Sequence, residues 1–133
     1  MRGNWVAEVS PVTGKHIDAI LPFLEQFEEA GVMPWFNYDE AVVEFQQILY
    51  ANDWVTPKVH WVEWQDVAEE YVDSPEKIKS ADVVTIQKLF TTHVRKDRFC
   101  EGHLASMFEN GHIVALLRRL KDIREITPDT AER

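Results

Sequence analysis

The chain has 133 residues, of which 45% are hydrophobic, and this length and composition indicate one globular domain and exclude an intrinsically disordered chain. Its formal net charge of −9 opposes binding to nucleic acid or anionic membranes at long range, and no apolar run reaches the ~20 residues of a membrane span. Because a single cysteine cannot form an intramolecular disulfide, and because no signal-peptide pattern is present, we expect a cytoplasmic protein without membrane contact.

Helical spacing of apolar residues dominates the first half of the chain. Residues 17–27 follow this spacing with Pro22 inside the pattern, so we expect a first helix that is kinked or that begins near Leu21. A second helix is expected after Asp39, which is a natural N-cap, and it should end at Asn52.

An aromatic stripe marks the third predicted helix. Trp61, Trp64 and Tyr71 share one face at helical spacing, which favours a core-facing helix over a surface that stacks a flat ligand. Trp54 lies in the loop before this helix, and we expect it to anchor that loop. Ser74-Pro75-Glu76 then predicts the start of a short helix, because it places a cap, a rigid first residue and an acid in that order.

A longer helix is expected over residues 83–98. Phe90 belongs to its apolar stripe, whereas Thr91 and Thr92 fall on the opposite side. His93 is in phase with the apolar stripe, where a hydrogen-bonded core histidine is more common than a metal ligand. We therefore interpret His93 as part of the core.

Two further helices, over residues 101–110 and 112–125, are expected on either side of Asn110-Gly111. Together they have the size of a helix-turn-helix. A recognition helix must present polar side chains at its start, however, and the last helix begins Ile113-Val114-Ala115. We do not expect sequence-specific binding of DNA.

Charge is unevenly distributed, with a net −10 over residues 1–81 and a net +2 over residues 82–125. In the second half, the side chains of the residue 95–103 corner could clamp a carboxylate or phosphate, or could lock two helices together. Cations near the end of the last helix could contact phosphate or simply complement the helix dipole. The candidate binding residues are Arg95, Arg98, Glu101, His103, Arg118 and Arg119.

We predict no metal site and no cofactor. Histidines 93, 103 and 112 lie within twenty residues together with Cys100, but they lack the closely spaced ligand pairs of zinc sites. Cys100 and His103 could form a thiol nucleophile with its base, but a lone cysteine is more often a small apolar filler.

Aromatic, basic and glycine residues form a characteristic succession along the chain: Tyr50, Trp54-Val55, Trp61, Trp64, Leu89-Phe90-Thr91, Val94-Arg95, Arg98-Phe99, Glu101-Gly102, Leu104, Gly111 and Leu117-Arg118-Arg119-Leu120. Over residues 13–125 this succession resembles a prokaryotic family of unknown function, DUF6508. Its most distinctive part is the Arg-x-x-Arg-Phe-x-x-Gly stretch. The resemblance implies a small, stand-alone, mainly helical protein, and it brings no activity or catalytic residues.

These patterns predict an all-α fold. We expect a compact single-domain bundle of about five to six helices within residues 1–126. Residues 4–9 are expected as a short strand or an arm, and residues 127–133 as a frayed tail.

Three hypotheses for function follow. The leading one is a non-enzymatic helical module that acts through protein contacts, as a homodimer that buries part of the aromatic or Leu-rich surface. The first alternative is a binder of an anionic ligand or nucleic-acid backbone through Arg95, Arg98 and the basic last helix. The second is an enzyme whose pocket, at the residue 95–103 corner, holds a group with a perturbed pKa.

Overall fold

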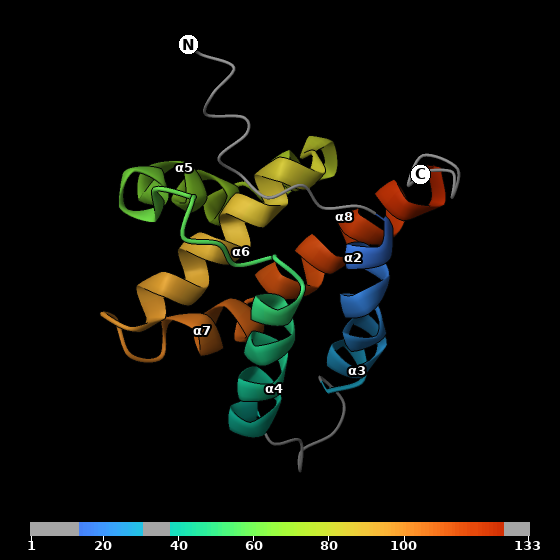
Figure 1. The fold of residues 1–133 in the computed structure, drawn as a ribbon, viewed down its shortest axis with the longest axis horizontal. Coiled ribbons are helices and arrows are strands. Elements are labelled where there is room, and N and C mark those ends of the chain that lie inside the picture. The colour runs from blue at the N-terminus through green and yellow to red at the C-terminus, as the bar shows by residue number, and fades with distance from the viewer. Residues whose placement is uncertain (1–13, 31–37, 127–133) are drawn as a thin grey trace.

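The computed structural model of the chain describes residues 14–30 and 38–126. Within these residues the protein has seven α-helices, one 3-10 helix and no strand, which confirms the predicted all-α class (Figure 1). The predicted N-terminal strand or arm and the predicted C-terminal tail lie outside the described residues. The elements are α2 (Gly14–Ile20), α3 (Pro22–Ala30), α4 (Tyr38–Ala51), α5 (Trp61–Asp73), the 3-10 helix η1 (Pro75–Ser80), α6 (Val83–Asp97), α7 (His103–Glu109) and α8 (His112–Ile126).

Pro22 divides the first predicted helix into two. Helix α2 ends at Ile20, and α3 begins at Pro22 itself. Proline has no N–H to donate and disfavours helical geometry in the preceding residue, but at the first position of a helix its missing N–H costs no hydrogen bond. The expected interruption at Pro22 is therefore confirmed.

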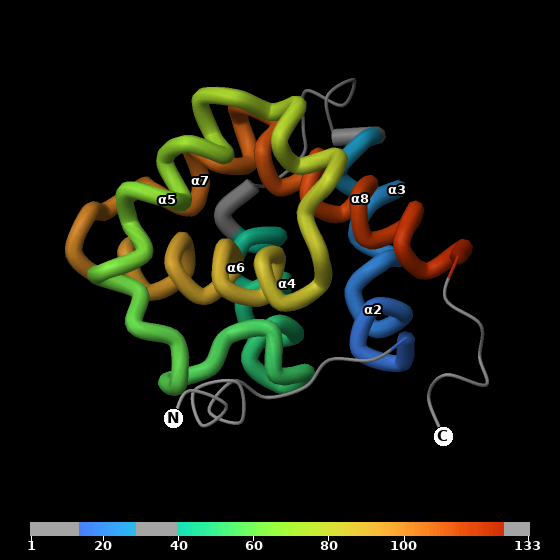
Figure 2. The backbone as a smooth tube through the Cα atoms, turned by 90° about the horizontal axis from the view of Figure 1, so that it is seen from above, coloured from blue at the N-terminus to red at the C-terminus, as the bar shows by residue number. Residues whose placement is uncertain are grey.

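Helix α6 is the central helix of the bundle, and α5, α7 and α8 pack along its sides (Figures 1 and 2). Its middle turns are buried around most of their circumference. Thr91 and Thr92, predicted on the side opposite the buried stripe, are only 0% and 1% exposed, so that part of the prediction is wrong. A periodic pattern identifies the most apolar side of a helix, but it does not report how many neighbours surround that helix.

Edge-to-face aromatic contacts fill the centre of the core. The ring of Phe45 on α4 makes such contacts with Phe23, Phe27, Phe90 and Phe108 from α3, α6 and α7, at centroid separations of 5.1 to 5.9 Å. This geometry places the positive ring edge against the negative ring face. Four helices are joined through one phenylalanine.

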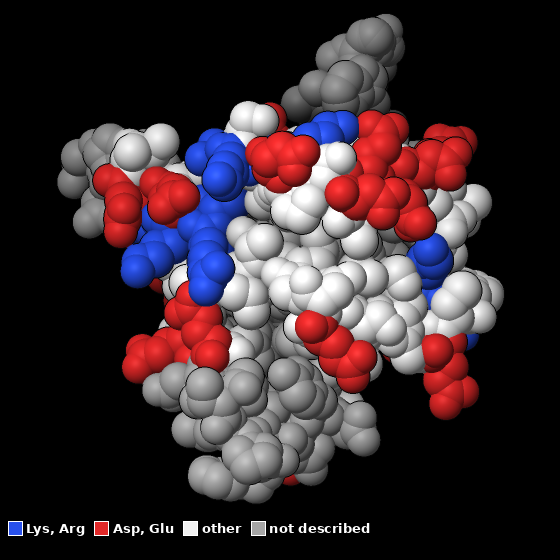
Figure 3. Space-filling model, turned by 180° about the vertical axis from the view of Figure 1, so that it is seen from behind, with Lys and Arg blue, Asp and Glu red and all other residues white. Residues whose placement is uncertain are grey.

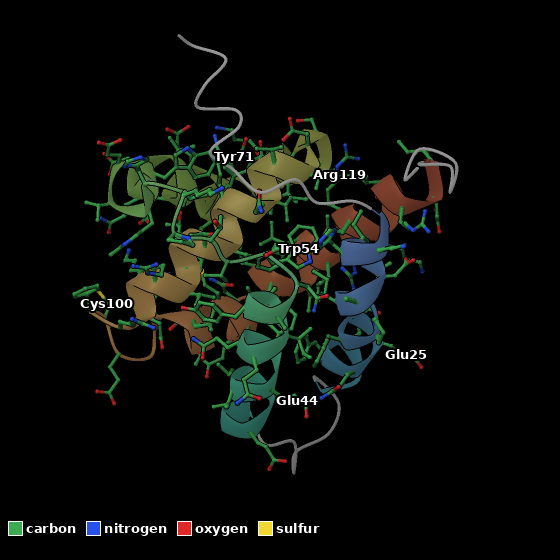
Figure 4. All side chains as sticks on the ribbon, in the orientation of Figure 1. Glu25, Glu44, Trp54, Tyr71, Cys100 and Arg119 are labelled. Atoms are coloured by element: carbon green, nitrogen blue, oxygen red, sulfur yellow. The ribbon has the colours of Figure 1, made fainter. Side chains whose placement is uncertain are left out.

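Trp54 anchors the loop between α4 and α5, as predicted. Its side chain is fully buried near the middle of the molecule (Figure 4). The indole Nε1 donates a hydrogen bond to the carbonyl oxygen of His16 at 2.9 Å, and the ring packs edge-to-face on Phe90. The loop is thereby fixed to α2 and α6 at once.

The apolar stripe of α8 faces the inside of the chain. Leu116, Leu117 and Leu120 are each 0% exposed. The Leu-rich surface, one of the two surfaces proposed for a homodimer, is thus occupied by this chain's own core.

Candidate functional site

Three histidine rings from three different helices meet inside the molecule. His93 lies on α6, His103 is the first residue of α7, and His112 is the first residue of α8. The Nδ1 atom of His93 lies 3.0 Å from Nε2 of His103, and its Nε2 atom lies 3.0 Å from Nε2 of His112. The rings form one hydrogen-bonded series with His93 in the middle, which we call the histidine chain.

Two glycines in the left-handed region precede the outer histidines. Gly102, directly before His103, has φ of 86°, and Gly111, directly before His112, has φ of 84°. A side chain at such a φ costs strain, which glycine avoids. Each glycine reverses the chain just before a helix that packs on α6, and the first residue of that helix meets His93.

Side-chain caps hold the starts of both helices. The carboxylate Oδ1 of Asp97, at the end of α6, accepts a hydrogen bond from the backbone N–H of Leu104 at 2.9 Å. The amide Oδ1 of Asn110 accepts one from the backbone N–H of His112 at 2.9 Å. These bonds satisfy N–H groups that a helix start leaves without an internal partner.

Burial keeps the histidine chain neutral. His93 and His112 are 2% and 5% exposed. Burial lowers the pKa of His93 well below its usual range, since water no longer solvates an imidazolium there, and the charges of His112 and His103 lower it further. Burial also lowers the pKa of His112 to about 4, and the neighbouring His103 adds to this shift.

His103 is half-buried, and it is the end of the histidine chain that lies nearest to charged residues. Burial is the main cause that lowers its pKa, and the positive charge of Lys96 acts in the same direction. The carboxylates of Asp97 and Glu69 oppose this shift. His103 therefore faces cationic and anionic side chains from α5 and α6.

A cavity lies at each end of the histidine chain. The cavity beside His103 has a volume of about 10 Å³, roughly enough for one water molecule. The cleft beside His112 is larger, at about 120 Å³. Residues from α5, η1, the α7–α8 turn and α8 line this cleft: Val72, Pro75, Ile78, Asn110, Gly111 and His112.

The histidine chain is not arranged around one metal ion. His93 meets His103 and His112 with opposite ring nitrogens, so no single ion can contact all three rings through these atoms. Among the residues that the structure describes, no group of three or more His, Cys, Asp or Glu side chains is placed to hold a metal.

The candidate residues Arg95, Arg98 and Glu101 lie near one another in sequence but do not form the expected lock between helices. Within residues 14–30 and 38–126, no hydrogen bond or ion pair joins their side chains. Arg98 and Glu101 are exposed, and Arg95 is half-buried, with its Nε buried and without a hydrogen-bond partner in the described structure. The α6–α7 corner is instead held by Asp97.

An exposed aromatic stack occupies the outside of this corner. The rings of Phe99 and Trp61 stack with centroids 5.6 Å apart and an interplanar angle of 20°. Phe99 is nevertheless 75% exposed, and the neighbouring Val62 on α5 is 60% exposed. We call Trp61, Val62 and Phe99 the aromatic corner. Trp61 is only half-buried, so its predicted place in the core is not fully realised.

Cys100 follows Phe99 and is exposed at the outer edge of the molecule (Figure 4). His103 directs its Nε2 to His93 and not to this thiol. No hydrogen bond between the Cys100 and His103 side chains occurs in the described part of the chain. Cys100 is therefore a surface residue of the corner rather than an apolar filler.

The three arginines of α8 are engaged within the chain. Arg118 forms an ion pair with Glu28 at 2.7 Å, Arg124 pairs with Asp18 at 2.9 Å, and Arg119 Nε donates to the carbonyl oxygen of Ala81 at 2.8 Å. Acidic groups flank the basic cluster over α8 (Figure 3). Of the two α8 residues proposed to bind an anion, Arg118 is thus already paired with a carboxylate, and Arg119 is bonded to a backbone carbonyl oxygen.

Sequence reasoning identified His103 as a candidate and placed His93 in the core, but it did not foresee that these residues meet with His112. Spacings of ten and nine residues match no known ligand motif. The available signal was local, because both His103 and His112 directly follow a glycine at an expected break between helices.

Comparison with known families gives one match. The model of DUF6508, described as a family of unknown function, matches residues 12–126. No curated protein and no solved structure matches the chain. None of the helices in the described residues is both long and apolar enough to cross a membrane.

Proposed function

The chain belongs to DUF6508, a family of unknown function, and we propose that it is a non-enzymatic interaction module that forms a homodimer through its aromatic corner. One observation carries the proposal: Phe99 is 75% exposed although it is a large apolar side chain on a chain with a well-filled core. Burying an aromatic side chain of this size against a partner would contribute roughly 2 kcal/mol or more.

The charges beside Phe99 favour a second copy of this chain as the occupant. Arg98 directly precedes Phe99 in the sequence and Glu101 follows two residues after it, and both of these oppositely charged side chains are exposed. In a two-fold symmetric interface, a surface meets itself, so Arg98 of one copy would face Glu101 of the other. Such an arrangement is electrostatically complementary, which fixes register and disfavours wrong partners.

The acidic side of α5 limits how the two copies can approach. This helix has five Asp or Glu residues and no Lys or Arg, and its carboxylates face solvent. Two such faces would repel one another if they met across the two-fold axis of the dimer. The axis is therefore expected to pass beside Phe99, on the side away from the rest of α5. We place the dimer in the cytoplasm, where a reducing environment would preserve the exposed Cys100 thiol.

Cross-linking at Cys100 tests this dimer, because Cys100 is the only cysteine and lies next to Phe99. A short bismaleimide should convert the protein to a covalent dimer, and the Cys100→Ser variant should remain uncoupled. Phe99→Ser should abolish both the cross-link and the dimer seen by light scattering. Val43→Ser, at another exposed apolar position, on α4, is the control and should leave the dimer intact.

A charge exchange tests the symmetry of the interface. Arg98→Glu alone and Glu101→Arg alone should each weaken the dimer, and the double variant should recover it, because the pairing is restored with reversed polarity. A protein that stays monomeric at all concentrations, or a dimer indifferent to Phe99→Ser, would exclude the proposed surface.

A further inference from the structure

While its rings are neutral, the geometry of the histidine chain allows only two arrangements of the ring protons. A neutral imidazole carries one N–H and one bare nitrogen, so each contact between two rings needs one proton. His93 can donate through Nδ1 to His103 only while it accepts at Nε2 from His112, or the reverse. The two hydrogen bonds therefore always run in the same direction along the chain.

The two forms differ in which end carries an outward proton. When the bonds run toward His103, its Nδ1 carries the outward proton, and Nδ1 of His112 is bare. When the bonds run toward His112, the outward proton is on Nδ1 of His112, and Nδ1 of His103 is bare. Reversing the direction of both hydrogen bonds therefore moves one proton equivalent from one end of the histidine chain to the other, without changing the charge of the protein.

The cleft beside His112 supplies a place where such a proton could be used. Nε2 of His112 is bonded to His93, which leaves Nδ1 for a ligand, and this atom makes no hydrogen bond within the described residues. The cleft has apolar walls at Val72, Pro75 and Ile78, and no Asp, Glu, Lys or Arg lines it. Its volume of about 120 Å³ suits a small, uncharged, mainly apolar molecule.

From this geometry we propose that His112 is the acid–base group of a small-molecule site in this cleft, and that His93 and His103 relay its proton to solvent. The ligand class is a small neutral molecule with an apolar body and one weakly acidic hydroxyl. This site is independent of the aromatic corner and of the homodimer.

The relay balances in protons at every step. The hydroxyl of the ligand gives its proton to Nδ1 of His112, whose Nε2 proton passes to Nε2 of His93. The Nδ1 proton of His93 passes to Nε2 of His103, whose Nδ1 proton passes to water. One proton leaves the ligand and one enters water, and the histidine chain ends in its other form. Donation to the ligand is the reverse sequence.

The surroundings of the histidine chain suit this role. Burial disfavours the imidazolium form of all three rings, so neutral rings are available to accept and pass protons near pH 7. The water-sized cavity beside His103 provides an exit for the proton. Lys96 and Asp97 on α6 and Glu69 on α5 are the charged residues that act on this end: Lys96 lowers the pKa of His103, and the two carboxylates raise it.

Nitrogen NMR of the histidine rings tests the relay in the protein as it exists, because each ring nitrogen has a different shift with and without its proton. If the hydrogen bonds along the histidine chain reverse their direction, the four contacting nitrogens should show averaged shifts, with the minor form at up to roughly a tenth. The same fraction should apply to all three residues. Nitrogens that are fully protonated or fully bare would overturn the relay.

Phenol is a suitable probe for the cleft, since it combines an apolar ring with one weakly acidic hydroxyl. In the wild type, phenol should shift the ring nitrogens of His112 and, through the chain, those of His103. In His93→Gln, which keeps a donor and an acceptor but cannot pass a proton, phenol should still shift His112 and should leave His103 unchanged. His60→Gln, at an exposed histidine outside the chain, should behave as the wild type.

Two results of the phenol experiment would also overturn the proposal. Phenol that leaves His112 unshifted in the wild type excludes the cleft as a site for this class of ligand. Phenol that shifts His112 but not His103 in the wild type excludes the relay. Both readings come from the unmodified protein, so the proposal stays testable even if His93→Gln does not fold.

Discussion

The Nε2 atoms of His93 and His112 lie 3.0 Å apart, and the two rings meet edge to face at an interplanar angle of 85°. One proton between the two nitrogens satisfies both. A second proton would place two N–H groups against each other and would put charge into the core. The contact is therefore stable only while the rings remain essentially neutral.

Acid should weaken the fold before most carboxylates are protonated. The unfolded chain takes up protons on its histidines as the pH falls through about 6.5, whereas the folded chain resists this uptake because the pKa of His112 is lowered to about 4. The unfolded state then binds more protons, so stability decreases as the pH falls across this window. His112 alone accounts for about 3 kcal/mol of that loss.

Urea unfolding at pH 7, 6, 5 and 4.5 measures this loss as a falling midpoint. In His112→Gln the fall should be smaller, although the variant starts from lower stability. The carboxylate of the cap residue Asp82 accepts a hydrogen bond from the Thr85 N–H, and its pKa is lowered from 3.8. The stability that this cap provides is lost only at more acidic pH than the histidine window. A midpoint that stays constant between pH 7 and 5 would contradict the prediction.

Local sequence signals predicted most helix boundaries. Pro22, Ser74-Pro75 and Asn110-Gly111 each act on the backbone within one or two residues, so their effect does not depend on the rest of the fold. The surroundings of α6 could not be predicted in this way. Its burial depends on how many helices pack around it, and that is a property of the tertiary structure.

In the candidate site, too, local sequence predicted some features, and tertiary packing determines the others. The position of His93 on the apolar side of its helix was predictable from periodicity. Its two histidine partners were not, because α7 and α8 bring them in from separate helices and only the packing angles make the rings meet. The suggested lock between helices by Arg95, Arg98 and Glu101 relied on sequence proximity alone, and the described structure leaves Arg98 and Glu101 exposed.

Thr91 should contribute more to stability than its neighbour Thr92. The hydroxyl of Thr91 donates to the carbonyl oxygen of Trp54 at 3.2 Å and accepts from the backbone N–H of Thr56 at 3.3 Å. Thr91→Val keeps the shape but leaves two buried backbone groups without this partner, so we expect a loss of about 1–3 kcal/mol. Thermal unfolding measures it.

Thr92→Val is the matched control, since this buried hydroxyl bonds only to the carbonyl oxygen of Lys88 in the same helix. That carbonyl lies inside α6, where the helix supplies its own N–H donor, so the cost should stay below about 1 kcal/mol. Equal losses for both variants would show that Thr91 does not fasten the Trp54 loop to α6.

Gly111 should be needed for its backbone conformation and not for space. A Cβ at this position would meet nothing within 4 Å, but the φ of 84° is unfavourable for an L side chain. Gly111→Ala should cost about 1–2 kcal/mol, measured by urea unfolding, and Gly111→Asn should cost less, because asparagine tolerates this region better. Equal costs for the two variants would point to a steric cause instead.

Two phenylalanines nine residues apart should differ in what they do. Phe90 is fully buried and contacts Phe45 and Trp54 edge to face, so Phe90→Ala should lower the free energy of unfolding by about 3–5 kcal/mol. Phe99 is exposed and loses only its stack on Trp61, so Phe99→Ala should cost about 1 kcal/mol or less within one protomer. Urea unfolding at protein concentrations well below the dissociation constant of the dimer compares the two variants.

At high protein concentration, a dimer through the aromatic corner adds a concentration-dependent loss of stability for Phe99→Ala alone. A loss for Phe99→Ala that is large at every concentration would mean that this side chain supports the fold of the protomer rather than a partner surface.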